Sequence, residues 1–396
     1  MGHLTSLRIH NRLDQHRVFG LIMISGDMAE ARALELDELM IEIGPFRMPT
    51  SLESLRDPLS DGSRFFFGVI SQQLRDGPTS LWVKRRTGAT VGAAVARYDL
   101  LVDNHDALAH RVGNVLDESG SSAIVTGAVD SRWFPYGLAH RAGLEVDTWK
   151  LPGADEAAGP WAEVRAAMAR DGYAIFPERI PDALCDQFVA EVGTEIEAGR
   201  MTFVPGSSTR LHQTHRLPSG GRIWRFPPVV DFLSHWFGSP PAACQTLFYF
   251  NGSQQRAHQD TIHLTAFPAG HMCGVWVALE DVVPDSGELF VYPGSHRLPR
   301  LLAADLNLPK VREDYSPYAR FDDEVERLLV LGGFERKVYR PRKGEILVWH
   351  ENLVHGGSRR ENLTQTRISV VSHYFARGAI GYYDSRGEAA TLEELA

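Results

Sequence analysis

The sequence has few cysteines, no long apolar run and no excess of positive charge. Cys185, Cys244 and Cys273 are too few and too scattered for a disulfide framework or a zinc cluster. The net charge of −9 argues against a nucleic-acid-binding protein. No run reaches the ~18 apolar residues of a membrane span, and the first thirty residues contain no signal-peptide pattern. We therefore expect a cytoplasmic protein that binds neither nucleic acid nor membranes.

The length of 396 residues favours two domains, and the composition is that of a globular protein, with 43% hydrophobic and 23% charged residues. Residues 151–160 are rich in Gly, Pro and Ala and are typical of a linker. This boundary predicts an N-terminal domain over 1–150 and a second domain over 161–396.

Residues 1–150 show mixed helix and strand patterns, which indicate a small α/β domain. No glycine-rich dinucleotide-binding turn is present. We expect a packing or homodimerisation role; substrate presentation or small-molecule binding is the alternative. The predicted elements are a helix over 28–43, a hairpin of 81–84 with 91–100, a helix over 107–116, a strand over 122–128, a helix over 136–141 and a strand over 144–147.

Residues 161–396 contain short strands separated by turns, after two predicted helices. The helices cover 161–170 and the segment after Pro181, which ends near Gly199. Such a strand series predicts an antiparallel double-sheet jelly roll with flanking helices, whose mouth forms a concave site. The predicted strands are 245–250, 274–281, 288–292, 346–350 and 366–375.

His258 and Asp260 stand two residues apart, and His355 lies far along the chain. Two imidazoles and one carboxylate form the ligand set of non-haem Fe(II) oxygenases, which leaves coordination positions open. Alternate residues of a strand share a side, so His258 and Asp260 can reach one metal if they lie on, or just past, a strand end. The tripeptide His258-Gln259-Asp260 alone is weak evidence for a metal site, because a His-x-Asp pattern arises easily by chance in a chain with 16 His and 50 acidic residues.

Several further blocks occur around this motif in a fixed order. Together they resemble the phytanoyl-CoA dioxygenase-like family of Fe(II)/2-oxoglutarate oxygenases over residues 160–377. The blocks are Asp171-Gly172-Tyr173, His258-Gln259-Asp260, the segment 276–281, Ser286-Gly287-Glu288-Leu289, Pro293-Gly294-Ser295-His296, His355-Gly356-Gly357-Ser358 and Arg367-Ile368-Ser369.

The resemblance implies that His258, Asp260 and His355 bind Fe(II), and that 2-oxoglutarate and O₂ occupy the open positions. Arg367 would grip the distal carboxylate of 2-oxoglutarate, because a guanidinium pairs with a carboxylate through two hydrogen bonds. An Arg beside an apolar run is costly unless it is paired; a surface Arg is the alternative. Ser369 could add a hydroxyl to the same carboxylate, or be solvated.

Three further residues are candidates for ligand contacts, each with a structural alternative. Gln245 could contact the co-substrate or be a plain edge-strand residue. Trp276 could stack beside the substrate or belong to the core. Arg225 could meet an acidic group of the substrate, or be part of a solvated basic loop.

Other histidines compete with the triad. His212 and His215 have a spacing that fits one metal only on a helix, whereas the flanking Pro, Gly and Ser residues favour a loop. His263, His271, His350 and His373 are expected to be structural or substrate-facing, and His296 to be a turn residue.

The resemblance implies a dioxygenase that hydroxylates, or otherwise oxidises, a C–H bond of a small molecule and releases succinate and CO₂. Related halogenases replace the carboxylate with a small residue, so Asp260 favours hydroxylation. A small polar metabolite of a biosynthetic pathway is the expected substrate. Two alternatives remain open: a cupin-like metalloenzyme that does not use 2-oxoglutarate, and a non-catalytic binding barrel.

Overall fold

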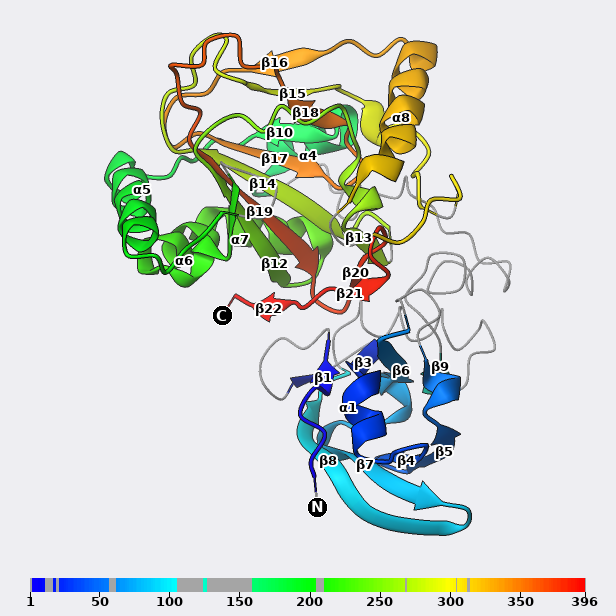
Figure 1. Ribbon diagram of the computed structural model, residues 1–396. Helices are drawn as coiled ribbons and strands as arrows, with labels where there is room; N and C mark the ends of the chain where they lie inside the picture. The colour runs from blue at the N-terminus through cyan, green and yellow to red at the C-terminus, as the bar shows by residue number, and fades with distance from the viewer. Residues whose placement is uncertain are drawn as a thin grey trace.

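The structure is a computed structural model with two regions, an N-terminal one and a C-terminal one (Figure 1). Arg377 of the C-terminal region forms an ion pair with Asp103 of the N-terminal region. No helix among the described residues is long and apolar enough to cross a membrane. The described residues are 2–10, 17–18, 21–56, 62–104, 124–126, 159–203, 210–267, 269–303, 305–311 and 314–395.

The N-terminal region contains a four-stranded sheet, β1-β3-β6-β9, and a five-stranded sheet, β2-β8-β7-β4-β5. Apolar side chains of both sheets form one buried core. The elements are β1 (Arg8–Ile9), β2 (Arg17–Val18), β3 (Leu21–Asp27), α1 (Met28–Ala33), β4 (Glu38–Ile43), β5 (Phe46–Ser51), β6 (Arg64–Ile70), β7 (Gly77–Thr87), β8 (Thr90–Val102) and β9 (Ile124–Thr126), with short 3-10 turns at Glu53–Leu55 and Ser71–Gln73.

The predicted hairpin is confirmed, since β7 pairs with β8 around Thr87-Gly88. The predicted helix over 28–43 is wrong in its second half. Only α1 is helical, and Glu38–Ile43 is strand β4, in which buried and half-buried residues alternate. A burial period of two residues is typical of a strand, and here it outweighs the helix-forming composition. Strand β9 lies within the predicted strand 122–128. The predicted elements over 107–116, 136–141 and 144–147, and most of the linker, lie outside the described residues.

The C-terminal region is built on a seven-stranded sheet, β10-β17-β14-β19-β12-β11 with β22 on β12, and all pairings are antiparallel. Two three-stranded sheets, β16-β15-β18 and β13-β20-β21, accompany it. The strands are β10 (Tyr173–Ile175), β11 (Arg210–His212), β12 (Pro241–Tyr249), β13 (Thr265–Phe267), β14 (Met272–Ala278), β15 (Leu289–Val291), β16 (Lys337–Tyr339), β17 (Ile346–His350), β18 (His355–Gly357), β19 (Ser369–Ala376), β20 (Ile380–Tyr383), β21 (Glu388–Ala389) and β22 (Glu393–Glu394).

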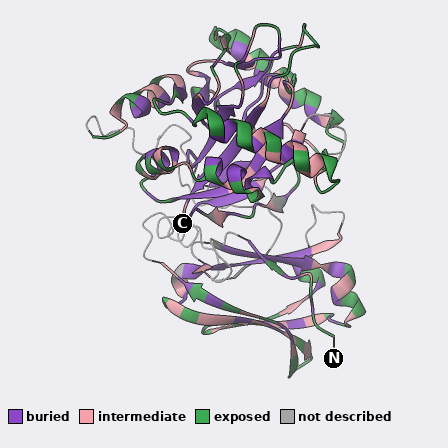
Figure 2. Ribbon diagram, turned by 90° about the vertical axis from the view of Figure 1, so that its left-hand side faces the viewer, coloured by how far each residue is buried: buried purple, intermediate pink, exposed green. Residues whose placement is uncertain are grey.

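Helices cover one side of this sheet, and their outward sides are exposed (Figure 2). Both helices expected at the start of the region are confirmed as α4 and α5, but the segment 218–221, expected as loop, opens helix α6. Pro218 suits a first helical turn, because its missing N–H is not needed there. The helices are α4 (Ala162–Asp171), α5 (Asp182–Glu197), α6 (Pro218–Trp224), α7 (Pro227–Phe237) and α8 (Ala319–Gly332), with 3-10 turns at Thr214–Arg216, Asp260–Ile262, Ser295–Arg297 and Ser316–Tyr318.

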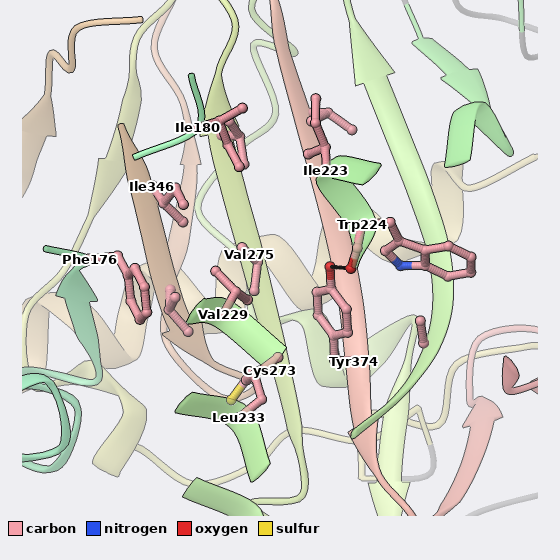
Figure 3. Close-up of a cluster of buried hydrophobic side chains, with 14 of the residues drawn as sticks. Phe176, Ile180, Ile223, Trp224, Val229, Leu233, Cys273, Val275, Ile346 and Tyr374 are labelled. Atoms are coloured by element: carbon pink, nitrogen blue, oxygen red, sulfur yellow. Dashed lines mark hydrogen bonds between the residues drawn. The ribbon is translucent and has the colours of Figure 1, made fainter. Parts of the chain in front are cut away.

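The largest apolar core lies between the sheet and the helices α4 to α7 (Figure 3). Alternate residues of β14, among them Cys273 and Val275, point into it together with Tyr374 of β19. The Tyr374 hydroxyl donates to the Trp224 carbonyl of α6 at 2.8 Å, which ties helix to sheet. The intervening residues of the same strands point to the opposite side, where the cavity lies.

Candidate metal centre

Backbone pairing holds the imidazoles of His258 and His355 side by side. The His258 N–H donates to the His355 carbonyl at 3.0 Å, and the His355 N–H donates to the His258 carbonyl at 3.1 Å. The ring centroids are 4.5 Å apart. His355 is the first residue of β18. His258 lies outside the named strands and pairs with His355 through an isolated β-bridge. These backbone hydrogen bonds join two distant parts of the sequence into one site.

A turn, and not strand alternation, brings the carboxylate of Asp260 to the two imidazoles. Asp260 is the first residue of the 3-10 turn Asp260–Ile262. Its Oδ1 lies 3.7 Å from His258 Nε2 and 3.6 Å from His355 Nε2. The three candidate ligand atoms all lie within 4.8 Å of one another, so one metal ion could contact all three. Asp260 therefore lies just past the β-bridge residue His258, which is one of the two positions that the sequence analysis allowed.

Both histidines are held in the tautomer that a metal ligand needs. Nδ1 of His258 lies 2.8 Å from the Arg256 carbonyl, and Nδ1 of His355 lies 3.0 Å from the Leu353 carbonyl. A carbonyl only accepts, so each Nδ1 carries the proton and donates it. Each Nε2 then presents its lone pair towards Asp260, as in metal sites where the second nitrogen is fixed by an outer hydrogen bond.

The charges of the site also suit a divalent cation. Burial, and to a smaller extent the nearby His355, lower the pKa of His258 to about 3, so His258 is neutral at neutral pH. Burial raises the pKa of Asp260, but His355, His373 and His258 outweigh this and hold it well below its usual value. The centre thus offers a neutral imidazole at His258 and an ionised carboxylate at Asp260, protonation states that suit metal binding.

The three side chains open into a cavity between the large sheet and the sheet β16-β15-β18. About half of its lining residues carry polar or charged side chains and most of the others are aromatic or aliphatic, which suits a small molecule with polar groups. The lining residues are Leu247, Tyr249, Ser253, Gln255, His258, Asp260, Trp276, Leu289, Trp349, His355, Gly356, Arg367, Val371 and His373.

Arg367 reaches the same cavity as the triad. It is 2% exposed, and its guanidinium carbon lies 5.6 Å from the Trp276 ring and 5.9 Å from the Tyr249 ring. Among the described residues no carboxylate forms an ion pair with it, and its Nε has no hydrogen-bond partner. Burial lowers its pKa to about 10, so it remains charged at neutral pH. A buried, unpaired cation is costly, which points to an anionic ligand in this cavity.

Ser369 and Gln245, the other two candidates for co-substrate contact, differ in their positions. Ser369 is fully buried just beyond Arg367, and its hydroxyl has no partner among the described residues. It is not part of the cavity lining. Gln245 does not line the cavity either; its Nε2 lies 3.3 Å from Nδ1 of His373. Gln245 is therefore connected to the site through another side chain.

The two candidates for substrate contact also separate. Trp276 is 1% exposed, lines the cavity and also packs in an apolar cluster. It therefore lies both in the core and beside the space for a substrate, the two alternatives that the sequence left open. Arg225 is exposed at the end of α6, against the Trp224 ring, and is not part of the cavity lining. Helix α6 lies on the other side of the sheet from the cavity, so Arg225 does not contact the cavity in this structure.

Sequence reasoning missed two contacts of Asp260. The indole Nε1 of Trp349 donates to Asp260 Oδ2 at 2.8 Å. Nε2 of His373 lies 3.5 Å from the same oxygen. No motif marks either residue, because both contacts follow from the register of neighbouring strands. The polar His373 within the apolar strand β19 was the available signal.

The rival histidines do not assemble a second centre among the residues that the structure describes. The one group of three ligand side chains close enough to share a metal is His258, Asp260 and His355. His212 ends strand β11, and His215 lies in the following turn with its ring 3.8 Å from that of Trp224. Nδ1 of His263 lies 3.2 Å from the Ser385 hydroxyl.

Comparison with known proteins agrees with this centre. The family model for phytanoyl-CoA dioxygenase (PhyH) matches residues 168–368. Phytanoyl-CoA dioxygenase domain-containing protein 1 of Danio rerio is 40% identical over 79 residues, which cover 19% of this chain and 27% of that protein. A probable phytanoyl-CoA dioxygenase of Caenorhabditis elegans is 25% identical over 189 residues, which cover 43% and 55%. The matches thus span about half, or less, of these relatives' length.

Solved structures with weaker overall likeness include the non-heme alpha ketoglutarate dependent epimerase SnoN from nogalamycin biosynthesis. It has a TM-score of 0.42 and 19% identity, over 56% of this chain and 85% of that chain. EctD from S. alaskensis with 2-oxoglutarate and 5-hydroxyectoine has a TM-score of 0.43 and 18% identity, over 56% and 77%. The family model covers more than half of the sequence and includes all three members of the triad. The chain belongs to the phytanoyl-CoA dioxygenase (PhyH) family.

Proposed function

We propose that this protein is an Fe(II)- and 2-oxoglutarate-dependent dioxygenase that hydroxylates a C–H bond of a small polar metabolite. The observation that carries the proposal is the presence of His258, Asp260, His355 and the unpaired Arg367 in one cavity. Metal ligands and a buried cation are the two anchors that a metal-chelating dicarboxylate needs. Family membership supports the same chemistry.

The donor set fits Fe(II). Two imidazoles and a carboxylate are the facial triad of non-haem Fe(II) oxygenases, and the three-ligand set leaves coordination positions open, unlike the four protein ligands of a structural zinc site. His258, Asp260 and His355 would hold the iron. When bound, iron and 2-oxoglutarate supply the oxidising chemistry, with succinate and CO₂ as co-products. Asp260 at the position where related halogenases have a small residue favours hydroxylation.

The rest of the cavity would position 2-oxoglutarate and exclude water. Arg367 is held between the rings of Tyr249 and Trp276, and would pair with the distal carboxylate through two hydrogen bonds. The buried Ser369 hydroxyl, which has no partner among the described residues, would donate to the same group after a small rotation. Leu247, Tyr249 and Val371 would keep water from the reacting centre.

The substrate would enter beside Ser253 and Gln255, the uncharged polar part of the lining. Their hydroxyl and amide suit a polar metabolite, which supports a biosynthetic substrate. We also propose that the facing sheets form the double-sheet jelly roll. Residues 1–150 would form a separate domain, and none of its described residues lines the cavity.

The test is a substrate-panel assay that measures succinate and detects a gain of one oxygen in the product by mass spectrometry. Arg367→Ala should raise the apparent KM for 2-oxoglutarate by roughly thirtyfold or more, because truncating one side of a buried charge pair costs about 2–5 kcal/mol. The exposed Arg327→Ala on α8 is the control and should leave KM unchanged.

Each alternative makes a different prediction in this assay. Unchanged turnover in Arg367→Ala would favour a metalloenzyme that does not use 2-oxoglutarate. Absence of succinate from the iron-loaded protein with every substrate would favour a non-catalytic binding barrel.

A further inference from the structure

Four side-chain positions form one row across the large sheet directly beneath Asp260. Gly274 of β14 stands opposite Trp349 of β17 on one side and opposite His373 of β19 on the other. His373 in turn stands opposite Gln245 of β12. Residues that are directly opposite in an antiparallel pair share a face of the sheet. The row Trp349–Gly274–His373–Gln245 therefore lies on the cavity face.

The glycine in this row makes room for its neighbours. A Cβ on Gly274 would overlap with the indole ring of Trp349. Glycine inside a strand weakens the strand and often marks a close approach of other groups. Here it lets the Trp349 indole lie over β14, with its centroid 6.4 Å from that of His373. Trp349 and His373 can then both reach Asp260.

The two oxygens of Asp260 have different partners. Oδ1 faces the Nε2 atoms of His258 and His355 at 3.7 and 3.6 Å. Oδ2 faces the other way, with Trp349 Nε1 at 2.8 Å and His373 Nε2 at 3.5 Å. The carboxylate is thus divided between the metal site on one side and protein donors on the other.

Gln245 sets the donor role of His373. Its amide Nε2 can only donate, so Nδ1 of His373, 3.3 Å away, accepts. In a neutral imidazole the proton is then on Nε2, which faces Asp260 Oδ2. The order of partners is therefore Gln245, His373 and Asp260, at the side of the carboxylate away from the triad nitrogens.

We infer that this row fixes Asp260 as a ligand through Oδ1 alone. Trp349 and His373 are positioning residues that keep Oδ2 in hydrogen bonds and away from the metal, and Gln245 sets the proton position of His373. A carboxylate bound through both oxygens would take a coordination position that the co-substrates need. This inference rests on the proposed function for the need to keep positions open, and its test does not depend on turnover.

The test is an oxygen-free titration with Co(II) alone, followed by its visible absorption, which reports coordination number. His373→Leu should weaken Co(II) binding by about tenfold to a hundredfold, the usual effect of losing an outer partner of a metal ligand, and change the absorption. His373→Gln should recover most of the affinity, because its amide also donates. Gln245→Leu should show a smaller loss.

His271→Leu is the matched control, because His271 is buried next to β14 but outside the cavity lining. It should bind Co(II) as the wild type does. If His373→Leu does not fold, His373→Gln and Gln245→Leu are compared instead. The inference then requires that Gln245→Leu weakens Co(II) binding, and changes the absorption spectrum, more than His373→Gln does.

Wild-type affinity and spectrum in His373→Leu and Gln245→Leu would overturn the inference. The proposed function fails differently, through unchanged 2-oxoglutarate dependence in Arg367→Ala. That variant should bind Co(II) normally in either case, so the two failures are distinguishable.

Discussion

The two faces of the large sheet are made by the same strands but have opposite chemistry. On β14, Cys273 and Val275 point into the helix-covered core, whereas Gly274 and Trp276 point to the cavity side. On β19, Tyr374 packs against α6, and its neighbour His373 approaches the candidate metal ligand Asp260. A shift of one residue in register would exchange the two sets.

This contrast teaches that stability and chemistry are assigned to different sides of one scaffold. The helix-covered face buries a large apolar cluster, which lowers the free energy of the folded state. The cavity face buries His258, His355 and Arg367, which cost free energy unless a ligand compensates them. Substitutions on the first face should therefore change unfolding, and those on the second should change ligand binding.

The largest expected effect on stability is on the helix-covered face. Phe232 of α7 is fully buried and contacts the ring of Phe176 at 5.7 Å between centroids. Phe232→Ala should lower the free energy of unfolding by about 3–5 kcal/mol, because it removes apolar contacts and leaves a cavity. Denaturant unfolding measures this loss, and KM for 2-oxoglutarate should not change at temperatures where the variant is folded.

The control for that prediction is Val330→Ala on α8, where the side chain is 80% exposed. Its unfolding midpoint should equal that of the wild type. An altered KM in Phe232→Ala would show that the two faces are not separable.

A smaller effect is expected where the faces meet at the sheet backbone. Gly274→Ala should lower stability by about 1–3 kcal/mol, because the added methyl group collides with the Trp349 indole. It should also weaken Co(II) binding, since Trp349 contacts Asp260. In contrast, Gly193→Ala within α5, where an added Cβ meets nothing, should raise stability by about 0.5–1 kcal/mol. Equal outcomes for the two glycines would refute the role of Gly274 as a spacer.

The smallest effect is expected at an exposed ion pair. Arg327 and Glu324 on α8 lie 2.6 Å apart, with 56% and 27% of their side chains exposed. Exposed pairs are screened by water and salt, so Arg327→Ala should leave the thermal midpoint and metal affinity unchanged within error. A clear drop in the midpoint would mean that surface charges contribute more than this account allows.

The metal triad could be proposed from the sequence because several blocks around it occur in the order of a known family, whereas the tripeptide alone is weak evidence. Arg367 could be proposed as a carboxylate anchor from the same resemblance, and because a cation beside an apolar run needs a partner. The local path was less predictable, since the sequence did not indicate that Asp260 opens a 3-10 turn. Arg225 was misplaced because charge alone does not say which side of the sheet α6 covers.

The contacts of Trp349 and His373 could not be predicted from the sequence. Each depends on which residues of β17, β14 and β19 stand opposite one another, and register is a property of strand pairs. In the N-terminal region, the Ala- and Glu-rich composition of 28–43 concealed the two-residue period of β4. Composition favoured a helix where burial decides for a strand.

The most direct test of the central claim is an oxygen-free titration of the wild-type protein with Fe(II) in the presence of saturating 2-oxoglutarate. We expect a weak visible absorption band that needs both components, saturates at one iron per chain and is lost in His355→Ala. An iron-loaded protein without this band, or a band that persists in His355→Ala, would contradict the assignment of the metal centre.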